Sequence, residues 1–195
     1  MLDSQGDEVR SLVVAAGGGD GEALRELWRL RRGLVGAVVL AHLPRGVEAE
    51  DVVQEVAALF VRGVGSIRDP GAFDPWIRRV AVNAARDAGR AASRSSGLVS
   101  GLALNGSVSG SSVGGAWAGS VSGAEEGRRL LELARELPED YREPLLLRCV
   151  RGLSYRAIAH AMELPETTVE TRIVRARRML RTLALERAGT QEVRP

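Results

Sequence analysis

Residues 154–178 decide the fold, and they read SYRAIAHAMELPETTVETRIVRARR. A short turn that contains Pro165 separates two clusters of apolar residues. The apolar positions are Ile158, Ala159, Met162, Val169 and Ile173. This spacing is typical of a helix-turn-helix, in which apolar side chains hold two short helices across one another. Ser154 is placed to cap the first helix, which is expected to cover residues 155–162.

The second helix of this motif is expected to run from Thr168 to about Arg187 and to expose a polar face. This recognition face comprises Thr168, Thr171, Arg172, Arg175 and Arg178. Arginine can hydrogen-bond the edge of guanine in the major groove, and a threonine hydroxyl can bond phosphates or bases. A solvated helix with salt-bridged arginines would show the same pattern, so the face alone leaves both interpretations open.

Helical periodicity extends upstream of this motif. Two further helices are expected, one from about residue 124 and one that ends before Gly152, a residue type that suits a helix C-terminus. Residues 124–188 are therefore expected to form one small helical domain. A C-terminal tail at residues 189–195 would follow it.

The first part of the chain indicates another helical domain, at residues 21–90. Apolar residues recur there at helical spacing in three stretches, of which the second begins near Glu48 and the third at Asp74. Asp74 is expected to cap the third helix, because Pro75 follows it and suits a first turn. Residues 1–20 are polar and end near three glycines, so they are expected to form a disordered N-terminal tail.

This domain has two candidate binding surfaces. The acidic face, on the second helix, comprises Asp51, Gln54 and Glu55. The basic stripe, on the outward side of the third helix, comprises Arg79, Asn83 and Arg86. No His or Cys lies near the acidic face to complete a metal site, and no partner base is evident for catalysis. The basic stripe is able to follow a DNA strand, although charged helix faces are often only solvated.

Residues 91–123 differ in composition from both domains. They hold mainly Gly, Ser and Ala, with almost no charge after Arg94. Such a segment cannot bury enough surface to fold alone, so it is expected to be a flexible linker. No stretch of the sequence shows the alternation of a β-strand. The expected fold is therefore all-α, with two small helical domains joined by a Gly/Ser-rich linker.

Composition excludes several classes of protein. Cys149 is the only cysteine, so no internal disulfide can form, and its apolar neighbours predict that it is buried. There is no run of about 18 apolar residues and no basic, apolar signal sequence, so a cytoplasmic location without membrane insertion is expected. The net charge is only +2, so affinity for nucleic acid has to come from local clusters of arginine.

Taken together and in this order, the segments resemble the sigma-70 family of RNA polymerase sigma factors, in its extracytoplasmic-function (ECF) subgroup. The similar segments are residues 50–55 (EDVVQE) and 73–87 for region 2, and residues 137–148 (LPEDYREPLLLR), 152–159 and 168–177 for region 4. The resemblance covers about residues 20–90 and 124–188. The region 4 match is the more specific.

The resemblance implies that the chain binds core RNA polymerase and promoter DNA. The first domain would dock on the clamp helices of the β′ subunit through the acidic face and read the −10 element through the basic stripe. The second domain would read the −35 element through the recognition face and touch the β flap. An anti-sigma factor is a further partner that the resemblance suggests. No cofactor is implied, and no catalysis by this chain, because the polymerase carries out the chemistry.

Several residues depart from the usual pattern of the family. Ala57 and Val61 stand where large or aromatic residues are usual, which questions the packing of the first domain. Gly63 and Gly65 are expected to loosen the segment that follows. These departures affect the domain that would open the −10 element.

Alternative functions fit parts of the sequence. A helix-turn-helix regulator without polymerase docking is one, although DNA would repel the acidic face. A diverged sigma domain held mainly by an anti-sigma factor would explain Ala57, Val61 and Glu170, the last at a position where lysine is frequent. Thr167 and Glu170 also have the spacing of a capping box, which would occupy that carboxylate. An enzyme is the weakest alternative, because both histidines are isolated and no nucleophile–base pair or phosphate-binding loop is visible.

Overall fold

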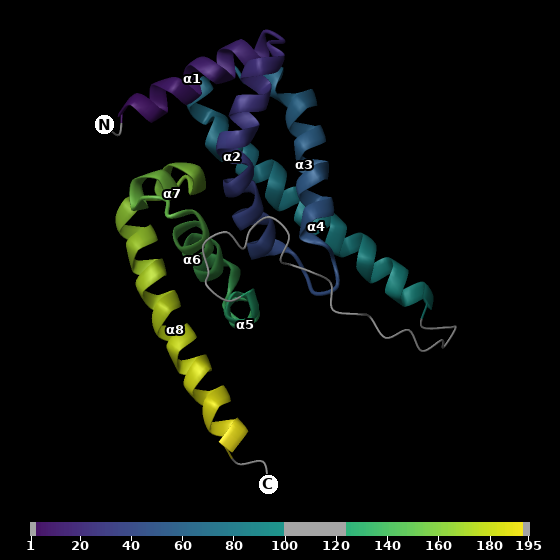
Figure 1. Ribbon diagram of the computed structural model, residues 1–195, viewed down its shortest axis with the longest axis vertical. Coiled ribbons are helices and arrows are strands. Elements are labelled where there is room, and N and C mark those ends of the chain that lie inside the picture. The colour runs from purple at the N-terminus through teal and green to yellow at the C-terminus, as the bar shows by residue number, and fades with distance from the viewer. Residues whose placement is uncertain (1–2, 100–123, 193–195) are drawn as a thin grey trace. The chain divides into compact units, whose positions relative to one another are not determined.

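The computed structural model describes residues 3–99 and 124–192, and every regular element in these two ranges is a helix (Figure 1). The expected all-α fold is therefore confirmed. The chain divides into two compact units, residues 1–111 and 112–195. No helix among the described residues is both long and apolar enough to cross a membrane.

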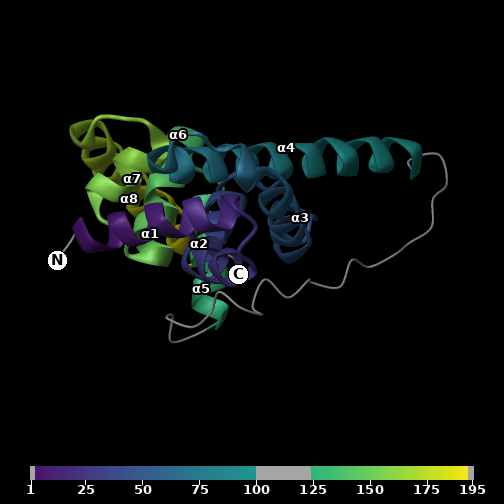
Figure 2. The same ribbon diagram turned by 90° about the horizontal axis from the view of Figure 1, so that it is seen from above.

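The first unit is built around one central helix. Its elements are α1 (Asp3–Gly17), α2 (Gly21–His42), α3 (Ala49–Gly63), the short 3-10 helices η1 (Val64–Ser66) and η2 (Pro70–Ala72), and α4 (Phe73–Val99). Helix α2 packs against α1, α3 and α4, and every residue from Gly33 to Leu43 is buried. The end of α4 extends beyond the other helices of this unit (Figure 2).

An aromatic cluster fills the centre of this unit. The ring centroids of Trp28 and Phe60 are 5.7 Å apart, those of Phe60 and Phe73 are 6.0 Å apart, and those of Phe73 and Trp76 are also 6.0 Å apart. The three contacts are stacked, edge-on and tilted in turn, and such contacts add to the stabilisation that burial gives. The cluster joins α2, α3 and α4. Val61 points outward with 57% of its surface exposed, so a larger residue there is not needed for the core.

The prediction of a disordered tail at residues 1–20 is wrong, because α1 occupies most of these residues. Val9, Val13 and Ala16 follow one another at helical spacing and are at most 6% exposed, since they pack towards α2. The helix ends at the glycines, and Asp20 then caps α2 by accepting hydrogen bonds from the next turn. The apolar stripe of α1 is short, but a neighbouring helix is available to bury it.

The expected role of Asp74 as a helix cap is also wrong. Asp69 caps the preceding turn instead, by accepting a hydrogen bond of 2.8 Å from the backbone N–H of Gly71. Asp74 lies in the first turn of α4 and accepts hydrogen bonds from the Arg31 guanidinium at 2.6 and 3.3 Å. This ion pair fixes the start of α4 against α2.

The boundary between the first domain and the linker lies later than expected. Helix α4 continues to Val99, so residues 91–99 are helical and do not belong to a linker. The rest of the expected linker, residues 100–123, lies outside the described residues.

Within residues 124–192, the second unit forms four helices: α5 (Ala124–Ala134), α6 (Glu139–Arg151), α7 (Tyr155–Met162) and α8 (Glu166–Glu192). Helix α8 packs against the other three. Helix α8 continues through most of the expected C-terminal tail, so the predicted end of the second domain at residue 188 is wrong. Cys149 is exposed and not buried as expected, because the last turn of α6 is more exposed than the run 143–147 before it.

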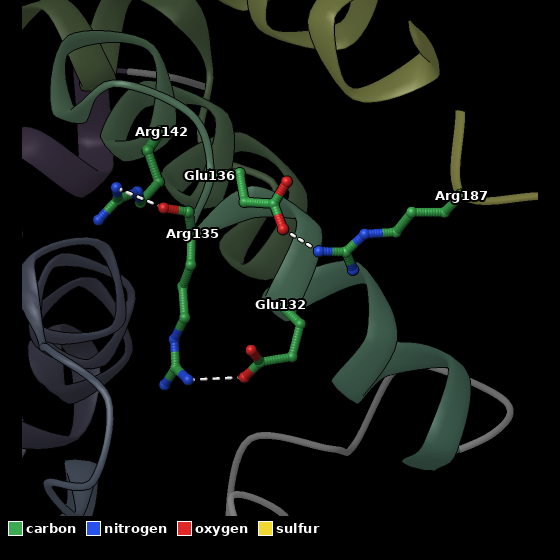
Figure 3. Close-up of polar contacts among 5 residues, drawn as sticks. All are labelled: Glu132, Arg135, Glu136, Arg142 and Arg187. Carbon is green, nitrogen blue, oxygen red and sulfur yellow. Dashed lines mark hydrogen bonds and ion pairs between the residues drawn. The ribbon is translucent and has the colours of Figure 1, made fainter. Parts of the chain in front are cut away.

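Arginine side chains fasten the turn between α5 and α6. Nη2 of Arg142 donates to the backbone oxygen of Arg135 at 2.8 Å (Figure 3). It also donates to the backbone oxygen of Leu137 at 2.7 Å. These carbonyls would otherwise lack a partner at the end of α5. Burial lowers the pKa of Arg142, but guanidinium remains charged at any physiological pH. Glu136, just after α5, forms an ion pair with Arg187 of α8.

Candidate nucleic-acid interface

The helix-turn-helix predicted from residues 154–178 is confirmed. The Ser154 hydroxyl accepts a hydrogen bond of 3.1 Å from the N–H of Ala157, which caps α7 as expected. Glu163 ends α7 in the left-handed conformation, with φ of 55°. Helix α8 then begins at Glu166, two residues earlier than predicted. The buried residues that hold the two helices together are Ile158, Ala159, Met162, Val169, Ile173 and Ala176.

The recognition face lies on the accessible side of α8. Thr171, Arg175 and Arg178 are exposed, and Thr168 and Arg172 are partly exposed. The Thr171 hydroxyl donates a 2.8 Å hydrogen bond to the Thr167 carbonyl, so its oxygen is left to act as an acceptor. The Arg172 guanidinium lies 3.6 Å from the Asp140 carboxylate of α6. The face thus offers arginine donors on a rigid helix, which is the chemistry that base edges and phosphates require.

The capping box expected from Thr167 and Glu170 is not formed. Helix α8 starts at Glu166, so Thr167 lies inside the helix and cannot cap it. The backbone N–H groups of Thr168 and Val169 bond the carbonyl of Pro165 instead, at 3.0 and 3.2 Å. Glu170 remains an exposed carboxylate in the first part of α8.

Arg148 positions the motif, and sequence reasoning did not single it out. Its guanidinium donates to the carbonyls of Leu153 at 2.8 Å and of Gly152 at 3.3 Å, and lies 5.3 Å from the centre of the Tyr155 ring. Gly152 adopts a φ of 65°, which suits glycine. These contacts fix the turn from α6 into α7. Arg148 lies near the C-terminus of α6, five residues before Leu153, and Leu153 follows the glycine that ends the helix. This spacing is the sequence signal that could have identified the role of Arg148.

The acidic face is exposed on α3. Asp51, Gln54 and Glu55 all point outward, while the opposite side of the helix is buried. Near them, the Glu50 carboxylate lies 3.6 Å from the Arg32 guanidinium. Across residues 3–99 and 124–192, no group of three His, Cys, Asp or Glu side chains is placed to hold a metal ion. The face can therefore offer charge complementarity to a basic surface.

The basic stripe is exposed on α4. Arg79, Asn83 and Arg86 follow one another at spacings of four and three residues, so they share one side of the helix. The opposite side packs into the core through Ile77, Ala81, Ala84 and Ala85. These core contacts hold the stripe in place on α4.

Gly63 does not loosen the segment before α4, contrary to expectation. A Cβ atom on Gly63 would lie 2.7 Å from Cζ2 of Trp76, so only glycine lets that ring pack. A Cβ on Gly65 would lie 3.4 Å from the carbonyl oxygen of Gly17 in α1. Gly63 thus marks a site of close packing against Trp76 of the aromatic cluster, whereas a Cβ on Gly65 would make an ordinary van der Waals contact.

Fold and surface together define a two-domain helix-turn-helix protein of the DNA-binding class. The family model "Sigma-70 region 2" matches residues 27–95, and "Sigma-70, region 4" matches residues 127–180. The chain belongs to the sigma-70 family of RNA polymerase sigma factors, in its ECF group, and it acts in promoter-directed initiation of transcription.

Curated relatives support this assignment over most of the chain. The ECF RNA polymerase sigma-E factor of Escherichia coli (strain K12) is 34% identical over 170 residues, which cover 85% of this chain and 88% of the relative. The ECF RNA polymerase sigma-E factor of Haemophilus influenzae is 31% identical over 175 residues, or 88% and 92% of the two chains.

Solved structures share the fold. CnrH, determined in complex with the cytosolic domain of CnrY, superposes with a TM-score of 0.61 at 24% identity and covers 91% of this chain and 97% of its own. The sigma factor RpoE of Bartonella quintana, in complex with the anti-sigma factor NepR, gives a TM-score of 0.55 at 19% identity, with 82% and 95% covered.

Proposed function

We propose that this chain docks on core RNA polymerase through the acidic face of α3 and reads promoter DNA through α4 and α8. The observation that carries the proposal is the separation of charge between surfaces. Asp51, Gln54 and Glu55 are exposed on one face of α3, whereas Arg79 and Arg86 are exposed on α4 and Arg175 and Arg178 on α8. DNA repels the first surface and attracts the other two, so the surfaces select different partners.

The acidic face is assigned to the clamp helices of the polymerase β′ subunit. Carboxylates at the protein surface strengthen encounter with a basic partner and fix its orientation, more than they add raw affinity. Because α3 is packed through Val52, Val56 and Phe60, the face is presented without rearrangement of the unit. The second unit would also touch the β flap.

The basic stripe is assigned to the −10 element. Arg79 and Arg86 would neutralise phosphates of the opened strand, and Asn83 lies between them on the same helix side. The Asn83 amide offers a donor and an acceptor, which can read the edge of an unstacked base. This arrangement suits single-stranded DNA.

The recognition face is assigned to the −35 element. A helix-turn-helix places the N-terminal part of its second helix in the major groove, where α8 presents Thr168, Thr171 and Arg172. Arg172 and Arg175 can each bond guanine, while Arg178 can contact phosphate one turn further on. Reading two promoter elements with two linked units raises total affinity above that of either unit alone.

An anti-sigma factor is proposed as a further partner. Two proteins of the same fold were determined with such a partner or with the cytosolic domain of another protein. The chain itself supplies recognition and no catalysis, and it would act in the cytoplasm, where the polymerase is found.

The proposal is tested by run-off transcription with purified core enzyme. Promoters are first identified by sequencing DNA that is bound to the assembled holoenzyme. Addition of the chain is expected to give transcripts that start at those promoters, whereas core enzyme alone gives none. Absence of core binding in a pull-down would contradict the docking assignment. Core binding without transcripts on any recovered promoter would favour the alternative of a diverged sigma domain that is held mainly by an anti-sigma factor.

A further inference from the structure

Helix α1 supports the connection between α3 and α4, although the matched model of sigma-70 region 2 begins only at residue 27. The connection comprises residues 64–72 and contains η1 and η2. Every residue from Gly65 to Ala72 is exposed or half-buried, so the connection has little core of its own. Segments with few buried contacts open easily unless another element holds them. Helix α1 packs against both η1 and η2, as well as against α2.

The end of α1 lies directly on the backbone of η1. A Cβ atom built on Gly17 would lie 3.7 Å from Cα of Gly65 and 3.9 Å from the carbonyl oxygen of Val64. These are ordinary van der Waals distances, so alanine fits at this position. Valine would add two γ-carbons at the contact and crowd η1. The approach of the two backbones therefore fixes η1 against α1.

Arg10 of α1 reaches the other end of the connection. A Cβ atom built on Gly71 would lie 3.6 Å from Nη2 of Arg10 and 3.2 Å from Oδ1 of Asp69, the residue that caps η2. The guanidinium and the carboxylate thus flank the same backbone position from two elements. Because both residues are exposed, their attraction adds little to the stability of the fold. Removing Arg10 should therefore disturb the connection without unfolding the unit.

The connection leads directly into α4 and the basic stripe. Helix α4 begins at Phe73, and Arg31 of α2 bonds Asp74 in its first turn. The basic stripe starts at Arg79, less than two helical turns further on. Helix α1 thus holds the connection while α2 holds the start of α4, so the position of the stripe depends on both.

We propose that α1 is a positioning helix for the reading of the −10 element, with Arg10 and Gly17 as its positioning residues. Through them it holds residues 64–72, and hence the basic stripe, in the arrangement that meets the opened strand. The inference rests on the proposed function of α4. A segment that is ordered before binding loses less conformational freedom when DNA binds, so α1 raises the affinity for the strand without touching it.

The test measures binding of a single-stranded −10 oligonucleotide, taken from a recovered promoter, to holoenzyme assembled with the full chain. Arg10→Ala with Gly17→Val is expected to weaken this binding by about fivefold, within the range in which residues that couple two parts of a protein act. Affinity for core polymerase and for a duplex with only the −35 element should not change, because these use α3 and the second unit. Arg10→Lys with Gly17→Ala should retain oligonucleotide binding.

Two control variants separate positioning from stability and from charge. Val38→Ala removes buried methyl groups late in α2 and destabilises the same unit, and Arg25→Ala removes one exposed arginine of α2. Urea unfolding shows which variants are folded under the assay conditions, and Arg10→Ala alone is the milder variant of α1. The proposal would be overturned if the α1 variants bound the oligonucleotide normally, if either control weakened that binding as much, or if the α1 variants lost core affinity.

Arg79→Ala with Asn83→Ala distinguishes this inference from the proposed function. If this pair weakens oligonucleotide binding while the α1 variants do not, only the positioning role of α1 fails. If neither set weakens it, the proposed function of α4 fails.

Discussion

Arg172 is the side chain on which −35 reading is expected to depend most. It lies in the second turn of α8, on a helix whose buried side holds Val169, Ile173 and Ala176 in place. A guanidinium held on such a rigid support can form both hydrogen bonds to guanine without losing much conformational freedom.

Replacing Arg172 or Arg175 with Ala should weaken binding of holoenzyme to a duplex that carries the −35 element. The loss should be about 1–3 kcal/mol for each base contact removed, and the base preference at one position should relax. A competition assay with every single-base variant of the element measures both effects. Equal affinity and unchanged preference would exclude these residues as readers.

Asp140 should limit the affinity of α8 for DNA of any sequence. Its carboxylate lies 3.6 Å from Arg172 and is 75% exposed, so it competes with phosphate for that guanidinium. Exposed ion pairs contribute about 0.2–1 kcal/mol, so Asp140→Asn should tighten binding to unrelated DNA by up to about fivefold. Filter binding at low salt measures this affinity.

Glu136→Gln is the matched control for this change. It removes the same charge from another ion pair with an arginine of α8, Arg187, at the far end of the helix (Figure 3). An equal gain of affinity for unrelated DNA in both variants would show that only the net charge of the chain matters. In an Arg172→Ala background, Asp140→Asn should have a smaller effect.

At the scale of elements, packing against α4 determines which substitutions the first unit tolerates. Gly63→Ala places a methyl group 2.7 Å from Trp76, where one ring of the aromatic cluster would have to move. Overpacking of this kind destabilises a core by about 1–3 kcal/mol. Urea unfolding followed by circular dichroism should show a lower midpoint.

Gly6→Ala is the control for the loss of a glycine. No atom lies within 4 Å of a Cβ built at Gly6, and the residue is inside α1. Alanine is favoured over glycine in a helix by about 1 kcal/mol, so this variant should be as stable as the natural chain or more stable. A destabilised Gly6→Ala with an unaffected Gly63→Ala would contradict the packing around Trp76.

The elements of the second unit could be predicted from sequence because their signals are local. Ser154, Gly152 and the apolar spacing each act within a few residues, and they define the end of α6, the bounds of α7 and the start of α8 to within two residues. In the first unit the deciding contacts are distant. Asp74 bonds Arg31, which lies 43 residues earlier, and no local pattern distinguishes that role from a cap.

The same reason explains the errors at α1 and at the glycines. Val9 and Val13 form a helix stripe that is stable only because α2 covers it. From sequence, Gly63 is interpreted as a flexible residue, whereas in the structure it packs tightly against Trp76. For the candidate surfaces, sequence placed the residues on the correct faces, but the Asp140–Arg172 ion pair and the role of Arg148 needed the packed structure.

At the scale of the whole molecule, docking and reading are assigned to different surfaces, so mutations should separate them. Reversing charge at Asp51 and Glu55, to Arg, should weaken core binding by about tenfold or more, which equals about 1.4 kcal/mol. The double variant Asp7→Arg and Glu22→Arg makes the same change of charge on α1 and α2, away from α3, and should bind core normally.

The dependence of transcription on chain concentration distinguishes the two surfaces. A docking defect is overcome by mass action, so the variant at Asp51 and Glu55 should need more chain for half-maximal transcription but reach the same maximum. A reading defect persists after docking, so Arg172→Ala with Arg175→Ala should lower the maximum on a promoter that depends on its −35 element. If reversal at Asp51 and Glu55 lowered the maximum and left the half-maximal concentration unchanged, α3 would act after docking, and the clamp-helix assignment would be wrong.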